Sequence, residues 1–251
     1  MSVSSIYGQR LLFEKDSLAN AIINLRRDNL IKGVLQTIVG TATFINKDKR
    51  IFIVTASHVS KDIDTKGYVI LKGHNDQPIR LKITDLLKDS VVKWKNNPNA
   101  DISLIELHPK KWVFDSGYLN NRFLPSSIFF DTLKSVSRET LLTTFGFPLG
   151  LGISGYFSPL TYRTYPSSGL ITLPRFDNQK LATFILLENP SIGGYSGGPV
   201  FDLGKIETGN IEMIKGTGTI CYGIIHGTIS DETGGKIAAI TPSFYLFEML
   251  K

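Results

Sequence analysis

Cysteine is almost absent from this sequence, which contains Cys221 alone among its 251 residues. A single cysteine excludes an intramolecular disulfide and a zinc site built from four cysteines. The sequence also has no apolar run near the roughly 20 residues that span a bilayer. Its first 12 residues lack the basic start, the long apolar stretch and the cleavage site of a secretory signal. These absences predict a reducing, cytoplasmic location and no contact with a membrane.

Charge and apolar content are ordinary for a folded protein. Hydrophobic residues make up 42% and charged residues 20%, which excludes disorder, collagen and coiled coil as the description of the whole chain. Lys and Arg number 28 against 22 Asp and Glu, for a net charge of +6. The basic residues are scattered and do not alternate with aromatic ones, so we expect a solvated surface rather than a specific nucleic-acid site.

Short β-type segments follow one another from Gly33 onward. They are rich in Val, Ile, Thr and aromatic residues, and turn residues separate them, which favours antiparallel barrels over parallel β-α-β units. The first series comprises residues 34–45, 51–56, 68–72, 79–83, 91–94 and 102–107. The second comprises residues 141–145, 156–165, 169–173, 183–188, 199–201, 219–226 and 237–240.

Helical patterns are confined to the two ends of the chain. Residues 18, 21, 22 and 25 are apolar at the spacing of one helix face, and residues 243–250 follow a proline as a terminal helix. The sequence therefore predicts an all-β fold of two six-stranded antiparallel β-barrels with a helix at each end. The predicted parts are a helical extension (1–32), a first barrel (33–115), a connector (116–137), and a second barrel with the C-terminal helix (138–251).

Three short stretches carry residue types that suit nucleophilic acyl transfer. An apolar strand ends in small residues just before His58, Asp101 stands at the head of another apolar strand, and glycines surround Ser196. A serine hydroxyl needs an imidazole to take its proton, and a buried carboxylate fixes the tautomer of that imidazole. Each stretch alone has a structural explanation as a strand end, a turn or a tight connection. Their order, with spacings of 43 and 95 residues, favours one joint site.

These stretches resemble the motifs of the chymotrypsin-like (trypsin-like) serine peptidases. Thr55-Ala56-Ser57-His58 is similar to Thr-Ala-Ala-His, Asp101-Ile102-Ser103-Leu104 to Asp-Ile-Ala-Leu, and Gly194-Tyr195-Ser196-Gly197-Gly198-Pro199 to Gly-Asp-Ser-Gly-Gly-Pro. Residues 146–152 resemble a Gly-Asn-Pro-Leu-Gly stretch of the HtrA-like branch. The resemblance covers residues 33–250 and includes no PDZ-like module.

The resemblance implies a serine endopeptidase that acts on protein or peptide substrates. It implies Ser196 as the nucleophile, His58 as general base and then acid, and Asp101 as the residue that orients His58. The N–H groups of Gly194 and Ser196 would form the oxyanion hole, in a cleft between the barrels, with no metal and no cofactor. Two alternatives stay open: a catalytically silent binding module with a protease-like cleft, and an effector that a regulatory protein partner activates.

Tyr195 departs from the family pattern. Digestive members carry an aspartate there, which pairs with a freshly cut N-terminal ammonium. Tyrosine has no carboxylate for that pairing, so we do not expect this activation switch. We expect the segment before Gly33 to pack as a fixed element, with a cleaved propeptide as the alternative.

The pocket for the substrate side chain is predicted from residues 190–193 and 223–228. His226 would enter the pocket, as a histidine on that strand does in glutamate-specific and some viral glutamine-specific relatives, and Ser191 and Thr228 would help to bind a polar side chain. The alternative is a histidine packed beside the cleft, because a one-residue slip turns a strand side chain to the other face. Residues 190–193 contain no acid, which disfavours an Arg/Lys pocket, although Glu188 is near.

Overall fold

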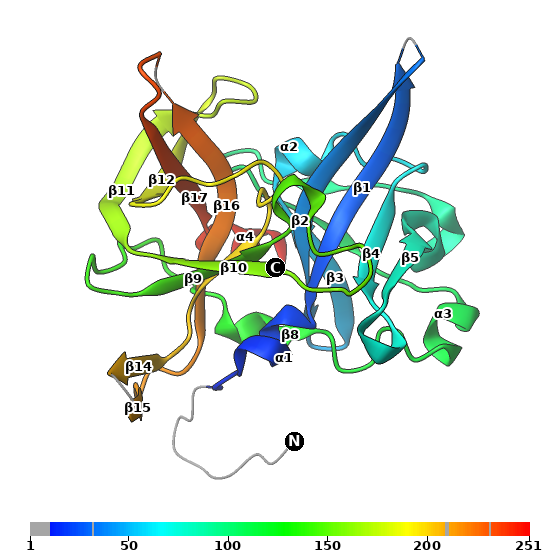
Figure 1. The fold of residues 1–251 in the computed structure, drawn as a ribbon, viewed down its shortest axis with the longest axis horizontal. Helices are drawn as coiled ribbons and strands as arrows, with labels where there is room; N and C mark the ends of the chain where they lie inside the picture. Colours follow the sequence, from blue (N-terminus) through cyan, green and yellow to red (C-terminus); the bar gives the residue numbers. More distant parts are fainter. Residues whose placement is uncertain (1–10, 32, 209–210, 231) are drawn as a thin grey trace.

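Antiparallel strands are the main regular structure of the protein, and they form two sheets that stand side by side (Figure 1). The computed structural model describes residues 11–31, 33–208, 211–230 and 232–251. The first sheet has the order β5-β4-β1-β2-β3-β7-β6, with β8 paired to β2, and the second has the order β10-β9-β13-β16-β17-β12-β11. The all-β, antiparallel character is therefore confirmed.

The first sheet contains β1 (Ile22–Ile31), β2 (Val34–Lys47), β3 (Arg50–Thr55), β4 (Tyr68–Lys72), β5 (Pro78–Lys82), β6 (Lys95–Asn96), β7 (Ser103–Glu106) and β8 (Leu124–Pro125). The second contains β9 (Leu142–Gly146), β10 (Leu160–Thr164), β11 (Pro166–Pro174), β12 (Leu181–Leu187), β13 (Pro199–Asp202), β16 (Ile220–Ser230) and β17 (Lys236–Pro242). A separate hairpin joins β14 (Lys205–Thr208) to β15 (Ile211–Ile214).

The helices are short. They are α1 (Lys15–Ala19), α2 (Ser57–Ser60), α3 (Lys111–Asp115) and α4 (Phe244–Met249), with 3-10 turns η1 (His74–Asp76), η2 (Ile83–Leu86), η3 (Lys88–Ser90), η4 (Ser126–Ile128) and η5 (Pro148–Gly150). Helix α4 confirms the predicted C-terminal helix. Among the helices of the described residues, none has the length and apolar character needed to cross a bilayer.

The predicted barrels of six strands each are not what the described residues form. The first sheet has eight strands and the second has seven. Each strand path has two ends that do not pair with each other, so neither path closes into a barrel. The stretch 91–94, expected as a strand, precedes the two-residue strand β6 instead.

The predicted N-terminal helix is wrong for most of its length. Only α1 is helical, and Ile22 begins β1, which pairs with β2 and β4 inside the first sheet. Residues 22–31 of the predicted extension thus belong to the first sheet, while residues 1–10 and 32 lie outside the described residues. Residues 22–25 of this strand are all buried, including the polar Asn24. A short buried segment of this kind cannot be told from a helix by its period alone.

One large apolar cluster fills the first sheet and continues into the junction with the second. It contains Phe44 and Ile53 of the first sheet, Phe201 of the second, and Leu246 and Met249 of α4. Helix α4 is also held to the first sheet by Asn97, whose side-chain amide donates to the carbonyl of Tyr245 at 3.1 Å. The two sheets therefore meet through a shared core, and the residues of the candidate site lie along this junction.

Candidate active site

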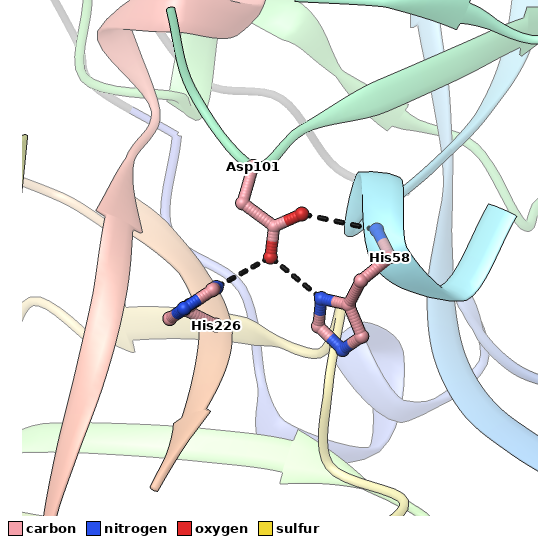
Figure 2. Close-up of side chains that lie close together, drawn as sticks. All are labelled: His58, Asp101 and His226. Carbon is pink, nitrogen blue, oxygen red and sulfur yellow. Dashed lines mark hydrogen bonds and ion pairs between the residues drawn. The ribbon is translucent and has the colours of Figure 1, made fainter. Parts of the chain in front are cut away.

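The carboxylate of Asp101 lies at the centre of the candidate site (Figure 2). Asp101 is fully buried just before β7. Its Oδ2 accepts hydrogen bonds from Nδ1 of His58 at 2.6 Å and from Nδ1 of His226 at 2.5 Å. Its Oδ1 accepts from the main-chain N–H of His58 at 3.0 Å and from Nη2 of Arg175 at 2.9 Å. A carboxylate has about four lone-pair sites, so these four donors occupy all of them.

Burial and hydrogen bonding act on the Asp101 carboxylate in opposite directions. Burial by itself raises the pKa, because it disfavours the charged form. The hydrogen bonds from His226 and His58 outweigh burial and hold the pKa of Asp101 well below its usual 3.8. Asp101 is therefore ionised at neutral pH, and both Nδ1 atoms carry the hydrogens that it accepts. In a neutral His58 ring this leaves Nε2 as a proton acceptor.

Helix α2 holds His58 at the end of β3. Ser60 Oγ donates to Ser103 Oγ at 2.9 Å, and Ser103 Oγ donates to Ser57 Oγ at 3.0 Å. Because Ser103 begins β7, this hydroxyl chain ties α2 to the strand that follows Asp101. The His58 side chain is 12% exposed, so part of the ring stays open to solvent.

The loop that carries Ser196 is bonded to both sheets. Thr41 of β2 donates its hydroxyl to the carbonyl of Gly194 at 2.6 Å and its N–H to the carbonyl of Ser196 at 2.9 Å. On the other side, Gly197 N–H donates to the carbonyl of Ile225 in β16 at 2.8 Å. The loop is therefore fixed between β2 and β16.

The peptide unit between Gly193 and Gly194 has a defined orientation. Leu149 N–H donates to the carbonyl of Gly193 at 2.7 Å. In a trans peptide the N–H points opposite to the C=O, so Gly194 N–H points away from Leu149. Within the described part of the chain, neither Gly194 N–H nor Ser196 N–H has an acceptor. Two such amides close in sequence are what an oxyanion hole requires.

Ser196 Oγ donates to the main-chain carbonyl of His226 at 3.3 Å. No hydrogen bond joins Ser196 Oγ to His58 in the described residues. The His58 and His226 rings meet edge to face, with centroids 5.7 Å apart. The structure thus brings His58 and Asp101 into direct contact. Ser196 Oγ lies at the main chain of His226, whose side chain is the second imidazole bonded to Asp101.

His226 is held inside the protein by Asp101 and by two aromatic rings, and its role in a substrate pocket stays a prediction. Its side chain is buried, its Nδ1 is bonded to Asp101, and the rings of Phe176 and Phe184 lie 4.4 and 4.7 Å away between centroids. The pairing of β16 with β17 shifts register between Ile225 and Gly227, so His226 is the extra residue of a β-bulge. Bulges re-aim side chains, and this one directs His226 toward Asp101.

Ser191 and Thr228, the other two expected pocket residues, are in contact. Thr228 Oγ1 donates to the carbonyl of Ser191 at 2.5 Å. Thr228 lies two residues beyond His226 on β16, and Ser191 lies on the segment that leads to Gly194. Their role in binding a substrate side chain stays a prediction.

Arg175 belongs to the site although no sequence motif points to it. Its side chain is only 6% exposed, and its guanidinium bridges Asp101 and Asp177, with Nε donating to Asp177 Oδ1 at 2.9 Å. Arg175 and Asp177 lie in the turn between β11 and β12, where charged residues are usually solvated. In the sequence, residues 175–177 therefore look like an ordinary surface turn, and nothing there indicates a contact with Asp101.

The same side chains also have the composition of a metal site. His58, Asp101 and His226 each offer a ligand atom, all within 4.8 Å of one another. Both Nδ1 atoms already donate to Asp101 Oδ2, however, and the Arg175 cation lies at Oδ1. A metal ion would have to displace these hydrogen bonds beside a fixed positive charge. The donor set favours a hydrogen-bonded cluster.

Cys221 is a core residue, as the sequence predicts. It is fully buried in β16, and burial raises the pKa of its thiol to about 12. The thiol is therefore protonated at neutral pH and is not an activated nucleophile.

Comparison with known proteins supports the fold. No protein-family model matches the chain, and no curated protein matches it. Among solved structures, the crystal structure of Deg5 superposes with a TM-score of 0.53 at 15% sequence identity, covering 93% of this chain and 88% of the Deg5 chain. At this identity the likeness shows the fold alone.

Proposed function

We propose that the protein is a serine endopeptidase, a hydrolase that cleaves protein substrates through an acyl-enzyme on Ser196. The proposal is carried by the 2.6 Å hydrogen bond from His58 Nδ1 to the buried carboxylate of Asp101. It is supported by the motifs around His58, Asp101 and Ser196, which resemble those of trypsin-like serine peptidases, and by the likeness of the fold to that of Deg5.

In the proposed reaction, Ser196 Oγ gives up its hydrogen bond to the His226 carbonyl and attacks the carbonyl carbon of the substrate. His58 Nε2 takes the Oγ proton, and the imidazolium that forms is stabilised by Asp101. The N–H groups of Gly194 and Ser196 receive the oxyanion. His58 then protonates the leaving amine, and water attacks the acyl-enzyme by the same route. Besides the substrate and one water molecule, these steps use side chains and amides of this chain.

The remaining parts of the proposal concern specificity and location. The adjacent residues Ser191 and Thr228 support a substrate pocket between residues 190–193 and β16. Residues 190–193 contain no acid, so we propose a preference other than Arg or Lys before the cut. The single, buried Cys221 supports a reducing, cytoplasmic location.

A fluorophosphonate probe tests the proposed function, because it reacts with an activated serine. We expect the wild-type protein to be labelled and Ser196→Ala to remain unlabelled, with labelling of His58→Ala strongly reduced. Equal labelling of the wild type and Ser196→Ala would overturn the assignment. If neither protein is labelled while both are folded, the catalytically silent binding module is the better description.

A further inference from the structure

We infer that His226 and Arg175 are positioning residues that set the orientation and charge of Asp101 for the chemistry of His58. The inference rests on the proposed peptidase function. It assigns to the two residues a role other than substrate binding, and it follows from where their polar atoms lie.

The Asp101 carboxylate is held from three directions. His58 approaches from α2, His226 from the bulge in β16, and Arg175 from the turn between β11 and β12. Figure 2 shows the two imidazole rings converging on one carboxylate oxygen. Without His226 and Arg175, the carboxylate would keep only its two bonds to His58, and rotation about its bond to Cβ would move Oδ2 away from Nδ1. Residues of the second sheet and its turn therefore fix the orientation of Asp101, which lies beside β7 of the first sheet.

The side chains around Asp101 also fix its charge. Two carboxylates, Asp101 and Asp177, share the single guanidinium of Arg175, and His58 and His226 are the other titratable groups in contact with Asp101. Arg175 and Asp177 are both less than one-tenth exposed, so solvent screens this charge weakly. One proton moving onto His58 balances the negative charge of the cluster. The arrangement thus favours the imidazolium that forms when Ser196 loses its proton.

The packing around His226 supports a fixed orientation rather than an incidental contact. Phe176 and Phe184 lie against its ring, and Gly227 follows it in the bulge with φ +157°. A Cβ at Gly227 would come within 2.8 Å of the Phe176 ring. The backbone and the aromatic rings together hold the imidazole toward Asp101.

Two substitutions at residue 226 separate hydrogen bonding from packing. His226→Leu fills similar space without a donor, whereas the amide nitrogen of His226→Asn reproduces the position of Nδ1. We expect the rate constant for fluorophosphonate labelling of Ser196 to fall at least about tenfold in the Leu variant, and to stay within about threefold of the wild type in the Asn variant. Arg175→Leu should reduce the rate, and Arg175→Lys should restore part of it.

Ser243→Ala is the matched control for general loss of stability. Ser243 is buried, and its hydroxyl donates to the carbonyls of Phe130 and Cys221, away from Asp101. We expect this variant to unfold at a lower temperature than the wild type and to be labelled at the same rate. Labelling of folded His226→Leu at the wild-type rate would overturn the inference, as would an equal loss in the Leu and Asn variants.

A second measurement needs no folded variant at residue 226. In protein with 15N-labelled histidine, NMR spectra report which ring nitrogen of each histidine carries hydrogen. We expect Nδ1–H on both His58 and His226, and assignment of His226 as the Nε2–H tautomer would overturn the inference. This readout does not depend on activity. If the wild-type protein shows both Nδ1–H groups but does not react with the fluorophosphonate, the proposed function is refuted and the bond from His226 to Asp101 is not.

Discussion

Of two neighbouring glycines in the Ser196 loop, Gly194 lies where the backbone requires glycine and Gly193 does not. Gly194 has φ +105°, and a Cβ there would lie 2.3 Å from the carbonyl oxygen of Phe147, whereas a Cβ on Gly193 would meet nothing within 4 Å. We predict that Gly194→Ala lowers the free energy of unfolding by about 1–3 kcal/mol and abolishes labelling of Ser196. Gly193→Ala should change that free energy by less than about 0.5 kcal/mol. Urea unfolding checks both, and equal stability of the two variants would contradict the loop geometry.

The Asp101 carboxylate links stability to pH. Because its pKa in the folded protein lies below 3.8, its contribution is fully present above the unfolded value and is lost as pH falls toward the folded one. We predict that the free energy of unfolding decreases as pH drops from 4 to 2. His226→Leu removes a hydrogen bond that lowers this pKa, so the free energy of unfolding of this variant should decrease less between pH 4 and pH 2. Ser243→Ala should show the same dependence on pH as the wild type. Urea titrations across this range measure the slopes, and parallel curves for wild type and His226→Leu would be the contrary result.

At the scale of elements, the Ser196 loop is anchored by an aromatic ring in place of an ion pair. Tyr195 is 4% exposed, and its ring meets Tyr162 edge-on with centroids 5.1 Å apart. Gly146 permits this contact, since a Cβ there would lie 2.6 Å from the Tyr195 ring. The anchor needs no ammonium from a cleaved N-terminus, which supports a loop that is formed without an activation step.

Substitutions of Tyr195 test this anchor. We predict that Tyr195→Phe keeps its labelling by the fluorophosphonate and loses less than about 1 kcal/mol of stability. Tyr195→Ala should lose about 3–5 kcal/mol because a buried ring is removed, and Tyr195→Asp should be destabilised by an unpaired buried carboxylate. Thermal unfolding and labelling rates measured together check the series. Full labelling of a folded Tyr195→Asp would show that the ring does not hold the loop.

Individual strands were predictable where a short run of β-branched and aromatic residues is bounded by turn residues. Strands β3, β4 and β17 are examples, and the motifs placed His58 just after β3 and Asp101 just before β7. Strand β1 was not predictable, because Ile22 and Leu25, together with Leu18 and Ala21 before the strand, also fit the spacing of one helix face. The bulge at His226 was not predictable either, since it depends on how β16 pairs with β17.

At the scale of the whole molecule, the candidate site depends on contacts between distant parts of the chain. Asp101 is 74 residues from Arg175 and 125 residues from His226. Spacing and motif type suggested the three residues of the proposed triad, but no local pattern shows which turn of the second sheet reaches the first. The contacts of Arg175 and His226 with Asp101 are therefore visible only in the folded chain.

The central claim is that the two sheets together activate Ser196, and locating the adduct tests it most directly. After fluorophosphonate treatment, the intact mass of the wild-type protein should rise by one label, and fragmentation of the peptide around residues 193–200 should place that label on Ser196. Ser196→Ala should keep its original mass under the same conditions. A folded wild-type protein that gains no mass, or one that carries the label on a residue other than Ser196, would contradict the account.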